Sequence, residues 1–145
     1  MGVVMSYELF EHRADIGVRG KGKTCEQAFE ECAKAMFSAM VDVERVAPKK
    51  KVQFDAHASD LEALLPEFLN NLLYVRDVQG MVFSRFEVKD LRQGPGQWGL
   101  KASAWGEKFD PNRHEPKTEV KAATFYQLSV RKTPQGFVAE CVVDV

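Results

Sequence analysis

Two aspartates are the residues of this chain whose types and positions best suit chemistry. Asp15 lies in the stretch HRADIG, where a first predicted strand ends, and Asp144 lies in the final VVDV. If these segments meet in the fold, the two aspartates and the carboxylate of Val145 form an all-oxygen cluster, which suits Mg, Ca or Mn better than soft-ligand metals. Adjacent carboxylates repel one another unless a cation or hydrogen-bond donors balance them. A solvated chain end is the ordinary alternative.

Two further polar residues could contribute to such a site. Asp60 precedes the second predicted helix, where a carboxylate also has the ordinary task of capping the helix. Lys121 lies in TEVKAAT, within a strand-like stretch. An outward lysine on an edge strand commonly discourages aggregation. The functional alternative is a cation beside the acidic site, placed for a phosphate or for a carboxylate of a partner.

The sequence carries no familiar catalytic signature. It contains no GxSxG, no P-loop, no HExxH and no dinucleotide fingerprint in its strand and helix context. The three histidines, His12, His57 and His114, lie in different segments, so none is paired with another along the chain. The histidines and motifs alone therefore indicate no particular reaction.

Length and composition indicate one globular domain spanning residues 1–145, with 45% hydrophobic and 28% charged residues. The formal net charge of −1 gives no overall basic field, so RNA is not favoured as a direct ligand. No apolar run approaches the roughly 18 residues that a membrane span needs. The three cysteines form no CxxC pair and are predicted to be buried. We expect a cytoplasmic protein without membrane contact.

The first half of the chain alternates strand and helix patterns. Predicted elements are strands at 7–12 and 16–21, a helix after Thr24, a strand at 52–56, and a second helix after Ser59. Both helices begin with capping-box spacing and carry an apolar stripe at helical spacing. Pro66 lies within the second stripe and predicts a kink there.

The second half reads as antiparallel hairpins. Stretches rich in branched and aromatic residues at 82–91, 98–105, 122–132 and 137–143 are separated by turn-forming sequence. Helices early and strands late predict an α+β domain, most simply a two-layer sandwich with both helices packed on one face of a mainly antiparallel sheet.

Several separated motifs in fixed order give the chain a specific resemblance. HRADIG, TCEQAFEECAKAMF, DLEALLPEFLNNLLY, WGEKFD, EVKAAT and a terminal DV follow one another over nearly the whole sequence. In this order and spacing the chain resembles the archease family. The resemblance implies a compact α+β fold similar to that of the Hsp33-like redox chaperones.

The resemblance also implies a function. Archeases are non-enzymatic protein cofactors of the RtcB-type RNA-splicing ligase of tRNA splicing, which uses GTP and a divalent metal. They promote guanylylation of the ligase and allow multiple turnover. The implied partner is therefore this ligase, with GTP bound by the ligase, tRNA contacted only indirectly, and a divalent ion such as calcium bound by the archease.

The family's site residues map onto this chain at matching positions. The resemblance places the metal at Asp15, Asp144 and Val145, and places contacts to the partner or to phosphate at Lys121, Asp60 and Glu107. Many relatives have a histidine where this chain has Tyr126, so we left Tyr126 out of the predicted site. Two alternatives remain: a small metal-dependent phosphoester hydrolase, and a general chaperone or adaptor.

Overall fold

A computed structural model describes residues 5–12 and 14–145 of the chain. The elements in chain order are β1 (Ser6–His12), β2 (Asp15–Gly22), α1 (Cys25–Met40), a 3-10 turn η1 (Val43–Arg45), β3 (Lys50–Ala58), α2 (Leu61–Gln79), β4 (Met81–Gly94), β5 (Gln97–Lys108), α3 (Pro111–His114), β6 (Ala122–Ala123), β7 (Ser129–Thr133) and β8 (Gly136–Asp144). None of the helices described is long and apolar enough to cross a membrane.

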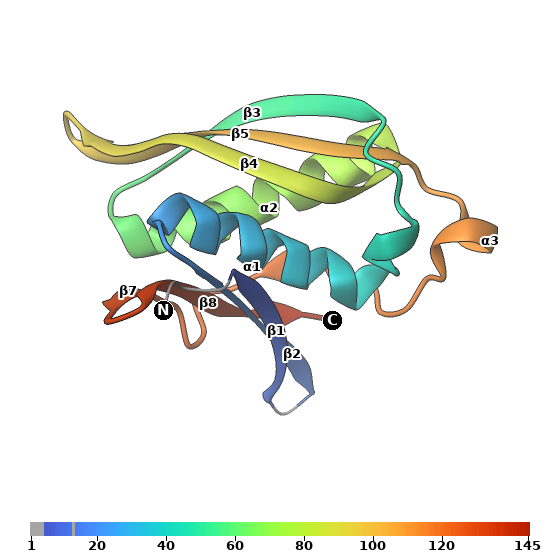
Figure 1. The fold of residues 1–145 in the computed structure, drawn as a ribbon, viewed down its shortest axis with the longest axis horizontal. Coiled ribbons are helices and arrows are strands. Elements are labelled where there is room, and N and C mark those ends of the chain that lie inside the picture. The colour runs from blue at the N-terminus through green and yellow to red at the C-terminus, as the bar shows by residue number, and fades with distance from the viewer. Residues whose placement is uncertain (1–4, 13) are drawn as a thin grey trace.

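The strands form two antiparallel sheets on opposite sides of the long helices (Figure 1). Sheet A has the order β1-β2-β8-β6, with β7 also paired to β8, and sheet B has the order β3-β5-β4. The predicted α+β class with antiparallel strands is confirmed. The layering differs from the expected two-layer sandwich, because α1 and α2 each contact both sheets.

The composition of α1 explains why it needs cover on two sides. Its buried residues form one broad face, opposite a polar face that carries Glu26, Glu30 and Lys34: Cys25, Ala28, Phe29, Cys32, Ala33, Ala35, Met36, Phe37, Ala39 and Met40. Small residues meet sheet A closely, since a Cβ on Gly20 of β2 would lie 2.2 Å from the Cys32 nitrogen. Phe37 lies on the other side, with its ring centroid 5.6 Å from that of Phe83 in sheet B. An apolar face this broad is removed from water only when neighbours cover the helix on more than one side.

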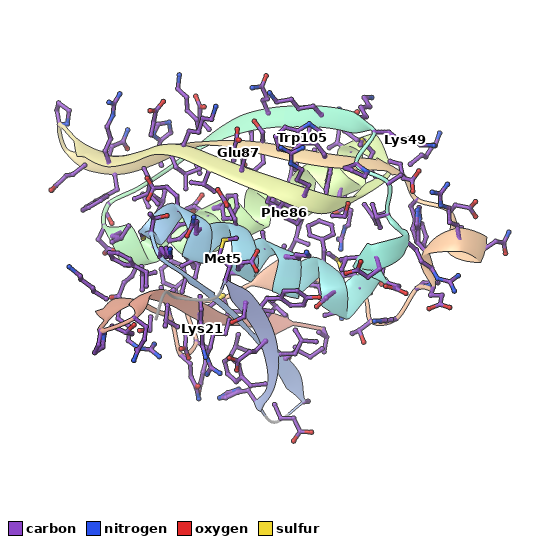
Figure 2. All side chains as sticks on the ribbon, viewed as in Figure 1. Met5, Lys21, Lys49, Phe86, Glu87 and Trp105 are labelled. Atoms are coloured by element: carbon purple, nitrogen blue, oxygen red, sulfur yellow. The ribbon has the colours of Figure 1, made fainter. Side chains whose placement is uncertain are left out.

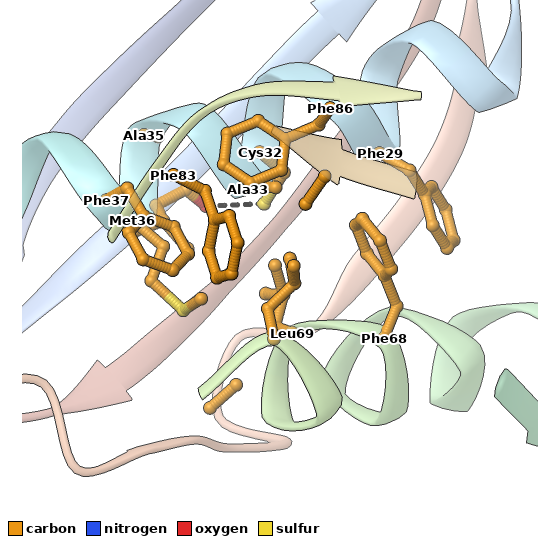
Figure 3. Packing of buried hydrophobic residues seen from close by; sticks show 14 of the residues in the cluster. Phe29, Cys32, Ala33, Ala35, Met36, Phe37, Phe68, Leu69, Phe83 and Phe86 are labelled. Atoms are coloured by element: carbon orange, nitrogen blue, oxygen red, sulfur yellow. Dashed lines mark hydrogen bonds between the residues drawn. The ribbon is translucent and has the colours of Figure 1, made fainter. Parts of the chain in front are cut away.

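Aromatic side chains fill the space between the helices and sheet B (Figure 3). The Phe29 ring of α1 lies 5.9 Å from the Phe68 ring of α2, so the two helices meet through these rings. In β4, Phe86 lies on the helix side, whereas Glu87 lies on the opposite side of the sheet (Figure 2). The three cysteines are buried, as predicted.

The starts of the two long helices follow the capping rules, with one shift. Thr24 accepts a hydrogen bond from the Gln27 nitrogen at 3.1 Å, as its spacing predicts. For α2 the cap is Asp60, the second of the two candidates at this helix start, which accepts from the Ala63 nitrogen at 2.7 Å, and Ser59 is not the cap. Helix α2 continues across Pro66 as one element of 19 residues.

The predicted strand at 122–132 is wrong as a single element. It is divided into β6 and β7 by a loop at 124–128. The Thr124 hydroxyl accepts a hydrogen bond from the Tyr126 nitrogen, and Gln127 adopts a positive φ of 51°. Both features turn the chain out of the extended conformation, and neither is visible in the branched and aromatic residue pattern.

Candidate functional site

The register of sheet A brings the two predicted aspartates together. In the antiparallel pair of β2 and β8, Ile16 lies opposite Val143, and both side chains pack against the core. The paired register ends there; continued by one position, it sets Asp15 opposite Asp144, on the face of the sheet that points away from the helices. Opposed residues of antiparallel strands have Cα atoms about 4.5 to 5.5 Å apart. Residues separated by most of the sequence therefore form one acidic edge.

His12 belongs to the same edge. It pairs with Asp15 across the hairpin of β1 and β2, so the two side chains share a face of the sheet. Its Nδ1 atom is buried and has no hydrogen-bond partner among the residues described. Arg13, the next residue, lies outside the described residues.

Lys121 and Val145 lie on the other side of Asp144. Ala122 of β6 pairs with Asp144, and the Lys121 nitrogen donates to the Asp144 carbonyl at 2.8 Å. Val145 is partly buried against the core, and the Lys121 side chain is exposed. Within residues 5–12 and 14–145, no carboxylate lies close enough to the Lys121 ammonium to form a salt bridge. The structure thus brings four predicted residues to one end of sheet A.

Helix α2 holds this end of the sheet in place. The Asn70 side chain donates to the Ala123 carbonyl at 3.0 Å and accepts from the Ala123 nitrogen at 2.8 Å. Arg76 donates to the Val120 carbonyl at 3.0 Å. Our sequence analysis did not identify either residue, although an asparagine beside an apolar helical stripe is a signal for a buried polar contact.

Tyr126, which we left out of the predicted site, lies beside it. Its ring centroid is 4.9 Å from that of His12 at an angle of 54°. Because β1 and β6 are at opposite ends of the strand order in sheet A, the loop at 124–128 reaches across the end of the sheet. The motif comparison alone could not show this, since it depends on the fold of the loop.

Asp60 is not part of the acidic edge. It caps α2, and Glu62 in the same first turn accepts from the Val130 nitrogen of β7 at 3.3 Å. Val130 pairs with Ala139, so this end of α2 lies near the beginning of β8. Asp144 lies five residues further along, or about 16 Å of extended strand.

Glu107 also lies elsewhere, at the end of β5 in sheet B. Its carboxylate accepts from the Ala47 nitrogen at 2.9 Å and contacts the His114 Nε2 atom at 2.9 Å. These two hydrogen bonds lower the pKa of Glu107, with a further contribution from the charge of Arg113. His114 Nδ1 accepts from the Asp110 nitrogen, so Nε2 carries the proton that is donated to Glu107. Glu107 therefore has a structural role here.

The acidic edge offers a partial set of ligands for a hard cation. Asp15 and Asp144 supply carboxylate oxygens, and Val145 supplies a backbone oxygen, which are the donors that Ca, Mg and Mn prefer. In the described part of the chain, no three side chains of His, Cys, Asp or Glu are gathered as a metal site. The donor set fits such an ion only when water or a second molecule completes its coordination.

Comparison with known proteins gives a consistent result. Residues 7–145 match the Archease protein family. "Protein archease" of Pyrococcus furiosus is 44% identical over 140 residues, covering 96% of this chain and 98% of that protein. "Protein archease" of Methanosarcina mazei is 41% identical over 139 residues, covering 96% of this chain and 95% of that protein.

Two solved structures share the fold. The solution structure of Methanobacterium thermoautotrophicum protein 1598 has a TM-score of 0.84 and 30% identity, covering 97% of this chain and 99% of that one. The crystal structure of an archease from Thermotoga maritima has a TM-score of 0.57 and 16% identity, covering 94% of each chain. At that identity the second structure supports the fold alone.

Proposed function

The chain belongs to the archease family, and from this premise we propose that it is a non-enzymatic cofactor of the RtcB-type RNA-splicing ligase. In this proposal it promotes guanylylation of the ligase by GTP and allows multiple turnover in tRNA splicing. GTP and tRNA are bound by the ligase, and this chain contributes its acidic edge.

The observation that supports the proposal most is the strand register of β2 and β8, which pairs Ile16 with Val143 and so brings the adjacent residues Asp15 and Asp144 to the same end of sheet A. Two carboxylates at neighbouring positions on an open sheet face repel one another, and this repulsion falls when a cation lies between them. Such an edge is suited to a partner that carries a divalent ion at its nucleotide site. The open face also leaves room for the partner to approach.

In this mechanism the carboxylates of Asp15 and Asp144 and the backbone oxygen of Val145 would hold a divalent ion at the ligase. A divalent ion stabilises the charge that develops when a phosphate is attacked and orients its leaving group. Lys121, at the rim of the edge, is placed to contact phosphate or a ligase carboxylate. Asn70 acts as a positioning residue, because it fixes β6 and so the neighbour of Asp144.

The test measures guanylylated ligase formed from GTP with limiting amounts of Asp15→Asn, Asp144→Asn and the parent chain. We expect each variant to lower the initial rate about tenfold or more, since loss of a ligand is at least as costly as loss of its supporting contacts. Asp55→Asn is the matched control, because Asp55 is an exposed strand aspartate in sheet B.

Normal stimulation by folded Asp15→Asn and Asp144→Asn proteins would exclude the acidic edge as the active element. Turnover of a phosphoester without ligase would favour the hydrolase alternative. An apolar cavity of about 350 Å³, lined by residues including Met40, Arg76 and Phe109, contains none of the predicted site residues. Binding to many unfolded chains without preference for the ligase would favour a general chaperone or adaptor.

A further inference from the structure

The loop at 124–128 exposes two adjacent aromatic side chains. Phe125 is 64% exposed and Tyr126 is 56% exposed, although both are large apolar residues. Exposed apolar groups are common singly on protein surfaces, whereas adjacent aromatics beside polar groups are typical of binding surfaces. These two side chains have no evident role in holding the core.

The backbone of this loop is fixed to β8. The Thr124 nitrogen donates to the Val142 carbonyl at 3.0 Å, and the Val142 nitrogen donates to the Tyr126 carbonyl at 3.1 Å. The Thr124 hydroxyl also donates to the Val142 carbonyl at 2.8 Å, and the Leu128 nitrogen donates to the Phe125 carbonyl at 3.3 Å. An aromatic side chain on a fixed backbone loses little conformational entropy when it binds, which favours affinity.

The two aromatics adjoin the acidic edge. The Tyr126 ring contacts the ring of His12, which pairs with Asp15, and Val142 lies two residues before Asp144 on β8. Phe109, an aromatic residue that is 41% exposed, lies instead after the end of β5 in sheet B. The loop therefore combines apolar area with neighbouring negative charge.

We propose that Phe125 and Tyr126 anchor this chain to the ligase, and this inference rests on the proposed function. The two aromatic side chains fit an apolar pocket of the ligase, next to its site for the divalent ion and the guanine nucleotide. When the aromatic side chains are bound in this pocket, the carboxylates of Asp15 and Asp144 face that ion. Affinity and activation are then divided between two neighbouring sets of residues.

Charge argues for this partner over two others. A second copy related by a twofold axis would bring four carboxylates from Asp15 and Asp144 into one interface, where they repel. An anionic lipid surface would repel the same carboxylates. An apolar pocket beside a divalent ion complements both the apolar and the acidic parts of this surface.

The experiment measures the Kd for the ligase, with metal and GTP present, for Phe125→Ser, Tyr126→Ser and Phe109→Ser. We expect the first two to raise the Kd about tenfold or more, since aromatic anchors dominate binding energy. Phe109→Ser is the matched control, and Tyr126→Phe retains the ring and the affinity. At saturating concentrations, Phe125→Ser reaches the parent level of guanylylation because its carboxylates are intact.

The inference is overturned if the Phe125→Ser and Tyr126→Ser proteins bind the ligase as the parent does. It is also overturned if Phe125→Ser abolishes self-association of the chain, seen by sedimentation, and leaves ligase binding unchanged. A parent chain that neither binds nor stimulates the ligase overturns the proposed function itself. Loss of stimulation in Asp144→Asn together with parent-like Kd values for the aromatic variants overturns the anchor alone.

Discussion

The outer face of sheet A has two ends with opposite electrostatic organisation. At one end the Glu140 carboxylate forms salt bridges with Arg19 at 3.1 Å and with Arg131 at 2.8 Å. The Glu8 carboxylate forms salt bridges with Arg19 at 3.0 Å and with Lys21 at 2.7 Å. Lys21 is labelled on this face in Figure 2. At the other end Asp15 and Asp144 form no ion pair with any described residue.

This difference separates charges that hold the fold from charges left available to a partner. Glu140 is buried, and burial raises its pKa, yet the hydrogen bonds and charges of Arg19 and Arg131 outweigh burial and leave the pKa below its usual value. Its negative charge is therefore balanced within the chain. The charges of Asp15 and Asp144 are balanced by no cation from the described part of the chain, which makes that end the better candidate for binding.

The largest effect on stability is expected at the end of sheet A where Glu140 forms its salt bridges. Glu140→Gln removes the charge between Arg19 and Arg131 while keeping the shape of the side chain, and leaves Arg19 partly buried without its main partner. We expect the free energy of unfolding to fall by about 2 kcal/mol, less than for a fully buried pair because Arg131 is exposed. Urea denaturation at neutral pH measures this change. A loss near zero would show that this network does not stabilise the fold.

The pH dependence sharpens the same contrast. Because the pKa of Glu140 is lowered in the folded protein, the stabilisation from its charge is present above the unfolded pKa of about 4.3 and is lost as pH falls through the lower folded value. The stability difference between the parent and Glu140→Gln should therefore shrink toward zero between pH 6 and pH 3. Urea denaturation of both proteins across this range tests it. A constant difference would assign the effect to packing.

The smallest effect is expected at the acidic edge. Asp15→Asn and Asp144→Asn remove charges that no described cation balances, so we expect the free energy of unfolding to change by about 0.5 kcal/mol or less. Relief of repulsion would give a slight increase. The measurement is urea denaturation without divalent metal. A large loss would mean that these carboxylates hold the fold, which would remove the distinction between the two ends.

Local signals predicted much of the fold. The capping residue Thr24, the apolar stripes of α1 and α2, and the hairpin pattern of β4 and β5 depend on neighbours within a few residues. The cap at Asp60 was predicted, whereas the division of the strand at 122–132 was missed, because it depends on which local side-chain hydrogen bond forms. The two-sheet layering was missed because one apolar face of a helix does not show how many sheets cover it.

The sequence by itself determined the elements, the family resemblance and the residue types of the acidic edge. Only the tertiary structure decided that Asp15 and Asp144 lie at the same end of sheet A, that Asp60 and Glu107 lie elsewhere, and that Tyr126 adjoins His12. The physical reason is the separation along the sequence of the residues that interact. Capping and periodicity are local, whereas the register between the second and the last strand is set by packing Ile16 and Val143 against the core.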